Sequence, residues 1–180
     1  GVDVINVNPK LYDLTSGAFS CWIKAPWLNH EFKDGGNALL GVRNSTSEDN
    51  FSNSTLRAIS IWDGTICDVS RNASDKPVVL GVKCSELPKS ADGWYHFVFN
   101  WNHSPEGTLT IETIVNGESK FTSNGPFQLR SELREFTIGY FYGSYLNGLL
   151  DDIGLFARPL TQEEARKIST SGKPLPETIR

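Results

Sequence analysis

The sequence has no hydrophobic run that could cross a membrane and no cluster of positive charge. A transmembrane helix needs about 18 or more consecutive apolar residues, and the 180-residue chain contains no such run. Its 17 Lys and Arg residues are outnumbered by 21 Asp and Glu residues, which gives a net charge of -4. The sequence shows no cluster of Lys and Arg of the kind that binds nucleic acid or anionic lipid. These absences argue against a membrane or a nucleic acid as the main partner.

Cysteine is scarce and methionine is absent. The three cysteines, Cys21, Cys67 and Cys84, lack the close spacing of a zinc site. Cys67 and Cys84 flank an expected loop and could form a disulfide or stay as thiols, while Cys21 lies in an apolar run and is expected to be a small buried hydrophobe. Because the chain has neither an initiator methionine nor a signal peptide, we expect a piece of a longer or processed protein.

The sequence also lacks the motifs of common catalytic sites. It has no Gly-x-Ser-x-Gly, no His-Glu-x-x-His and no glycine-rich phosphate loop. A Glu-x-Asp-x-Glu strand, which would place the two carboxylates of a retaining glycosidase, is missing too. We do not expect any of the three histidines to be a catalytic base, since His96 falls in an expected strand and His30 and His103 fall in expected loops. We therefore expect a protein that is not an enzyme; two carboxylates brought together from separate strands would leave no sequence signal.

What the sequence does contain is short alternating runs bounded by Gly, Asn, Asp and Pro, which predict an all-β fold. Residues 19–24, 94–101, 108–115 and 149–156 are examples of expected strands. The Asn116-Gly117 pair predicts a hairpin with a type I′ turn, because both residues tolerate positive φ. So many short strands predict two packed sheets. We expect one domain over residues 1–172 and a linker or C-terminal tail over 173–180.

A single short helix is predicted near the C-terminus. Thr161 and Glu164 have the spacing of a capping box, in which each side chain accepts a hydrogen bond from the other residue's amide. Pro159 interrupts the preceding strand, and Leu160 can pack against Ala165. The helix is expected to end near Gly172.

Four segments in this order resemble a known family: LTSGAFSCWIKAP, GWYHFVFNWN, ETIVNGE and LNGLLDDIGLFARPLTQEEARKI. They are similar to the opening strand, the Gly-x-Trp strand, the Asn-Gly hairpin and the closing strand and helix of laminin-G-like domains in the concanavalin A-like lectin/glucanase superfamily. The resemblance covers roughly residues 2–170. It implies an antiparallel two-sheet jelly-roll sandwich with one short C-terminal helix.

The adjacent carboxylates Asp151 and Asp152 are the candidate metal ligands. Successive residues on a strand face opposite ways, so one of them should point toward the sandwich or its rim. The resemblance implies a structural calcium ion, which prefers oxygen ligands. Asp151 is the first candidate ligand and Asp152 the second. The alternative is a buried aspartate bonded to backbone amides.

Aromatic residues in loops and at strand ends are the candidate ligand-binding residues, because sugars stack their C–H faces on flat rings. The candidates are Trp27, Trp62, Trp101, Tyr140, Tyr142 and Tyr145. Trp22 and Trp94 fall at strand positions that the family fills with core residues, and we expect them to be buried.

These observations favour a non-catalytic, lectin-like carbohydrate-binding module of a larger secreted or cell-surface protein, with a polysaccharide or glycan as its partner. We therefore expect the protein to be extracellular or at the cell surface. This functional expectation is a fold-level analogy. One alternative is a protein-interaction or adhesion domain of the same fold, and a less favoured one is a glycoside hydrolase.

Overall fold

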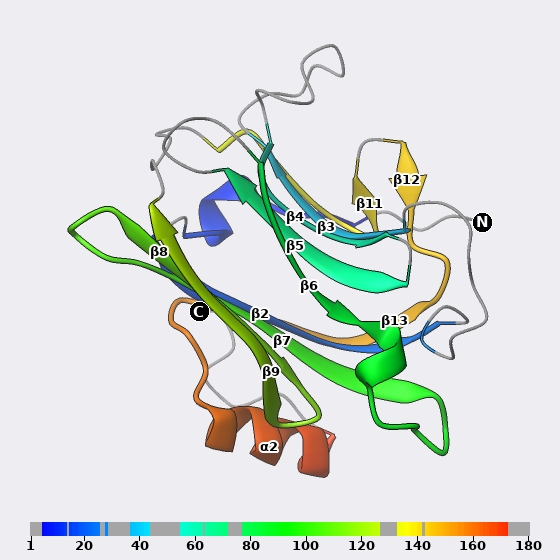
Figure 1. Cartoon of the computed structure of the whole chain (residues 1–180). Helices are drawn as coiled ribbons and strands as arrows, with labels where there is room; N and C mark the ends of the chain where they lie inside the picture. The colour runs from blue at the N-terminus through cyan, green and yellow to red at the C-terminus, as the bar shows by residue number, and fades with distance from the viewer. Residues whose placement is uncertain are drawn as a thin grey trace.

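The computed structural model describes residues 5–13, 15–25, 28, 37–43, 55–62, 64–71, 77–126, 133–141 and 143–172. Within these residues the chain forms two antiparallel sheets that face each other, with a helix on the outside of one of them (Figure 1). None of the helices in this part of the chain is long and apolar enough to span a membrane.

The first sheet has six strands, in the order β1 (Ile5–Asn6), β10 (Glu135–Ile138), β3 (Asn37–Arg43), β4 (Thr55–Trp62), β5 (Thr65–Arg71) and β6 (Pro77–Lys83). The second has five, in the order β13 (Leu149–Phe156), β2 (Ser16–Lys24), β7 (Trp94–His103), β8 (Thr108–Val115) and β9 (Glu118–Pro126). The remaining elements are η1 (Pro9–Leu11), η4 (Cys84–Glu86), the hairpin β11 (Tyr140–Phe141) and β12 (Ser144–Tyr145), and the helix α2 (Gln162–Ser171). The predicted jelly-roll sandwich is confirmed.

Alternation along β2 and β7 separates the two faces of the five-stranded sheet. The core between the sheets takes the odd-numbered residues of both strands, including Phe19, Ile23 and Phe97. Even-numbered residues point outward, and two of them, Ala18 and Val98, pack in a separate apolar cluster beneath α2. Both faces of the sheet are therefore partly apolar, one against the other sheet and one against the helix.

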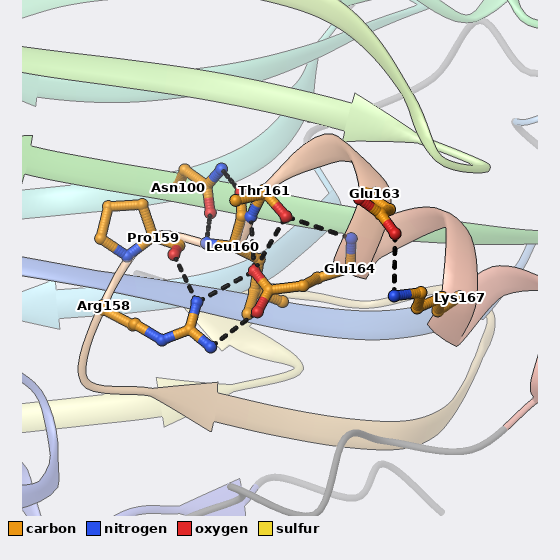
Figure 2. A network of polar contacts seen from close by, with 8 residues as sticks. All are labelled: Asn100, Arg158, Pro159, Leu160, Thr161, Glu163, Glu164 and Lys167. Carbon is orange, nitrogen blue, oxygen red and sulfur yellow. Dashed lines mark hydrogen bonds and ion pairs between the residues drawn. The ribbon is translucent and has the colours of Figure 1, made fainter.

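The capping box of α2 forms as the sequence predicts (Figure 2). The Glu164 amide donates to the Thr161 hydroxyl at 3.2 Å, and the Thr161 amide donates to the Glu164 carboxylate at 2.8 Å. Arg158 donates two hydrogen bonds to the same carboxylate, and these bonds, with those from Thr161, lower the pKa of Glu164 to about 2. The helix ends at Gly172, whose φ of 61° is the left-handed conformation that glycine adopts at helix ends.

Asn100 fastens the start of this helix to the sheet. Its amide group donates to the Leu160 carbonyl at 2.8 Å, and its carbonyl oxygen accepts from the Leu160 amide at 2.9 Å (Figure 2). A third bond joins Asn100 to Glu112 on the neighbouring strand. Since Asn100 is buried, these bonds satisfy polar groups that would otherwise be costly to enclose.

A buried ion pair lies in the core between the sheets. The Arg57 guanidinium on β4 donates to both carboxylate oxygens of Asp68 on β5, one of them at 3.0 Å. It also donates to the Tyr12 hydroxyl at 3.4 Å and lies 4.8 Å from the centre of the Trp101 ring. One guanidinium group thus ties two neighbouring strands to Tyr12 and Trp101, which lie far from them and from each other in the sequence.

The Asn116-Gly117 hairpin is confirmed, with φ angles of 50° and 76° that a type I′ turn requires. Cys21 is buried in the core, as predicted. No disulfide joins Cys67 to Cys84. Cys67 lies opposite Gly81, whereas the Cys84 amide bonds to Gly64, three residues before Cys67. Three residues along a strand span about 10 Å, too far for a disulfide.

Candidate ligand-binding surface

The hairpin of β11 and β12 is anchored on the outer face of the six-stranded sheet (Figure 1). Its Phe141 is buried against Ala38 and Ala58. Gly41 on β3 leaves the space that this ring fills, because a Cβ atom there would lie 2.3 Å from the Phe141 ring. The Tyr140 carbonyl accepts a hydrogen bond from the Thr137 hydroxyl at 2.7 Å. The hairpin is therefore a fixed feature of this face.

The anchored hairpin presents a pair of tyrosines. Tyr140 and Tyr145 are cross-strand partners, and their ring centres lie 4.9 Å apart at an interplanar angle of 43°. Alternation directs them away from the face that buries Phe141. Tyr145 is 47% exposed and Tyr140 is half-buried. Of the six aromatic residues predicted to bind a ligand, these two are brought together by the structure.

Three of the other candidates cannot be placed in the same way. Trp27 and Tyr142 lie outside the described residues. Trp62 is the last residue of β4, opposite Thr65, and its side chain is outside the described part.

The prediction that Trp101 is exposed at the end of a strand is wrong. Trp101 is only 2% exposed. Its ring stacks on Tyr12 with the centres 4.5 Å apart, and its indole N–H donates to the Asp13 carbonyl at 2.6 Å. The strand continues to His103, and the N-terminal segment covers the ring. Trp101 is therefore a core residue.

The prediction that Trp22 and Trp94 are core residues is also wrong. Both are half-buried, and both lie at even-numbered positions of β2 and β7, on the outer face of the five-stranded sheet. Trp22 is paired with His96, and their rings lie 5.3 Å apart. The core positions next to them are taken by Ile23 and Tyr95.

Asp151 and Asp152 also differ from the expected arrangement. Asp151 is paired with Trp22, so it lies on the outer face and is exposed. Asp152 falls at a β-bulge between Asp151 and Gly154, has a φ of 46° and is half-buried. The Asp152 amide donates to the Asp151 carboxylate at 2.9 Å. No group of three or more His, Cys, Asp or Glu side chains suited to a metal occurs among the residues with a described position.

Taken together, the opposed antiparallel sheets, the outer helix and the surface aromatic residues define a jelly-roll sandwich, an architecture that includes lectin-like and other binding domains. The chain belongs to the concanavalin A-like lectin/glucanases superfamily, since a laminin-G-type model of that superfamily matches residues 3–166. A comparison with curated proteins finds no match.

Solved structures with a similar fold include receptor-binding domains of botulinum neurotoxins. The domain of the C/D mosaic serotype is 16% identical, with a TM-score of 0.62, over 93% of this chain and 40% of that chain. The type G domain is 13% identical, with a TM-score of 0.57, over 94% of this chain and 45% of that chain. This chain thus spans less than half of those domains, and at such identities the likeness concerns the fold alone.

Proposed function

We propose that this chain is a non-catalytic carbohydrate-binding module, and that the tyrosine pair on the β11–β12 hairpin contacts the glycan. The observation that carries the proposal is the pairing of Tyr140 with the exposed Tyr145 on a hairpin that Phe141 anchors. Flat rings with a polar hydroxyl suit sugars, which offer both C–H faces and hydroxyl groups. A rigid support keeps the entropy cost of binding low.

The absence of catalytic motifs supports a binding role over hydrolysis. Among the residues with described burial, Asp68 is the one buried carboxylate, and Arg57 neutralises it. Such a carboxylate is not available as an acid or a nucleophile. We propose that the module belongs to a secreted or cell-surface protein and holds it near a polysaccharide. Affinity from such a small surface should be modest and should rise when several copies act together.

Calcium is a further part of the proposal. Asp151 and Asp152 would supply carboxylate oxygens. Because no third carboxylate among the described residues is grouped with them, the remaining ligands would be oxygens of other kinds. We expect calcium to raise the melting temperature of the wild type and to raise that of Asp151→Asn less, because the substitution removes a charged ligand. Differential scanning calorimetry in calcium and in EDTA measures both shifts. Equal shifts for the two proteins would remove Asp151 from the metal site.

The expected effect of Tyr145→Ala is a loss of glycan retention of about tenfold, corresponding to about 1.4 kcal/mol for an exposed aromatic anchor. The melting temperature should stay unchanged, since Tyr145 contributes little to the core. Affinity gels made with a broad polysaccharide panel measure the retention. Leu11→Ala is the matched control, because Leu11 is 45% exposed and lies on η1, away from the hairpin.

The screen also separates the proposal from its alternative. Retention of the wild type and of Leu11→Ala, with loss for Tyr145→Ala, supports a glycan site at the hairpin. A wild-type protein that no glycan in the panel retains would contradict the proposal and would favour a protein-interaction domain.

A further inference from the structure

A second surface with sugar-binding chemistry lies on the opposite side of the sandwich. The outer face of the five-stranded sheet carries two neighbouring rows of side chains across β13, β2 and β7. We name this surface the tryptophan patch. Its first row is Leu149, Lys24 and Trp94, and its second is Asp151, Trp22 and His96.

The patch is exposed next to the part of the face that α2 covers. Leu149 is 60% exposed, the largest exposed fraction among the large hydrophobic side chains whose burial is described. Lys24 and Asp151 are exposed, and Trp22 and Trp94 are half-buried. The two tryptophans are diagonal neighbours on adjacent strands, a relation that places side chains roughly 7–8 Å apart. The three strands make the patch about 10 Å wide.

Two polar atoms beneath the patch have no hydrogen-bond partner. The indole N–H of Trp22 is enclosed and unpaired, and so is Nδ1 of His96, whose side chain is fully buried. The other ring nitrogen of His96 lies 2.8 Å from the Ser20 hydroxyl. Because the Trp22 N–H has no partner, a hydrogen bond from it to a ligand oxygen would not replace an existing one.

The chemistry of the patch matches a pyranose ring. The indole faces of Trp22 and Trp94 suit the C–H face of a sugar. Asp151 accepts hydrogen bonds and the Lys24 ammonium donates them, so that both roles of a sugar hydroxyl are met at the edge of the rings. The carboxylate and the ammonium carry opposite charges, which favours a neutral ligand over a charged one.

We propose that the tryptophan patch is a second glycan-binding site, specific for uncharged sugar residues. This inference rests on the proposed function. With the tyrosine hairpin on one sheet and the patch on the other, a single module would bind two chains of a polysaccharide at once. Such bivalence raises retention on a dense matrix far more than affinity for a short oligosaccharide.

The test follows the indole N–H signals and the tyrosine ring signals by NMR while cellohexaose, xylohexaose or laminarihexaose is added in EDTA, which keeps calcium away from Asp151. Each of the five tryptophans has one indole N–H, and Trp22→Phe and Trp94→Phe assign the signals of the patch. Trp101 is the internal control, because it is buried and bonded to Asp13. The titration is repeated in Tyr145→Ala, which removes the hairpin site and leaves the patch intact.

We expect the Trp22 and Trp94 signals to shift in a saturable way in the wild type and in Tyr145→Ala, with the Trp101 signal unmoved. Trp94→Ala, made in the Tyr145→Ala background, should weaken this remaining binding about tenfold. Asp151→Asn gives a milder second test that leaves the apolar surface intact. Shifts confined to the tyrosine ring signals would overturn the second site and keep the proposed function. If no sugar shifts any signal, the proposed function and this inference both fail.

Discussion

Replacement of Arg57 by methionine is expected to lower the free energy of unfolding by about 3–5 kcal/mol, the usual cost of leaving one partner of a buried ion pair alone. The Asp68 carboxylate would stay in the core without its counter-charge, because its side chain is 2% exposed. The Tyr12 hydroxyl would lose its bond from Arg57 as well, and the cation above the Trp101 ring would be gone. Urea unfolding at pH 7, followed by tryptophan fluorescence, measures the loss.

Two further variants show that the loss comes from the uncompensated charge. The double variant Arg57→Met/Asp68→Leu should recover most of the stability, since replacing a whole buried pair by apolar side chains is often neutral or stabilising. Arg158→Met removes a similar bond from the partly exposed pair with Glu164 and should cost at most about 1 kcal/mol. An Arg57→Met protein as stable as Arg158→Met would contradict the expectation.

The parts of the fold that the sequence predicts correctly depend on local chemistry. The turn at Asn116-Gly117 follows from the φ angles that two residues allow, and the start of α2 follows from the side chains of Thr161 and Glu164. Each signal lies within a few residues and needs no partner from elsewhere in the chain. Buried pairs such as Arg57 and Asp68 give no such signal, because two charged residues in separate strands look the same whether they face the core or the solvent.

The orientation of the tryptophans could not be predicted, because β2 is covered on both faces along the part where Ala18 lies. A strand with one face in water alternates between apolar and polar residues, and the apolar set marks the core. In β2 the outward Ala18 packs beneath α2 while the inward Phe19 and Cys21 fill the core, so the alternation is weak. Trp22 then fits either face by composition alone. Trp101 was misjudged for a related reason, since Tyr12, which covers it, lies far away in the sequence.

The tyrosine pair was partly predictable. Three tyrosines close together in a glycine-bearing segment indicated an exposed aromatic site, and the structure places Tyr140 and Tyr145 next to each other on a hairpin. The anchor could not be predicted, because Phe141 fits beside Gly41, a glycine about a hundred residues earlier in the chain. Whether the pair binds a glycan remains a prediction for the affinity gels.

Acid is expected to destabilise the protein through His96. Burial opposes the charged imidazole and lowers the pKa of His96 to about 4, whereas an unfolded chain titrates near 6.5. Since the native pKa lies below the unfolded one, the unfolded state takes up the proton first as the pH falls. The stability that neutral His96 contributes is fully present above about pH 6.5 and is lost as the pH falls from 6.5 to 4. The total loss in the free energy of unfolding is about 3 kcal/mol.

Urea unfolding of the wild type and of His96→Gln at pH 7, 6, 5 and 4 isolates this contribution. The glutamine does not titrate, so the variant should start at a lower stability and lose about 3 kcal/mol less than the wild type over the range. Glu164 interferes little, because a carboxyl group with a native pKa of about 2 loses its contribution only as the pH falls below its unfolded value of about 4.3. Parallel losses in the two proteins, or a native His96 that titrates near 6.5 by NMR, would show that solvent reaches the imidazole. The enclosed Nδ1 beneath the tryptophan patch would then be a solvated atom, and the patch would have to bind sugar through its exposed ring faces and charged edge alone.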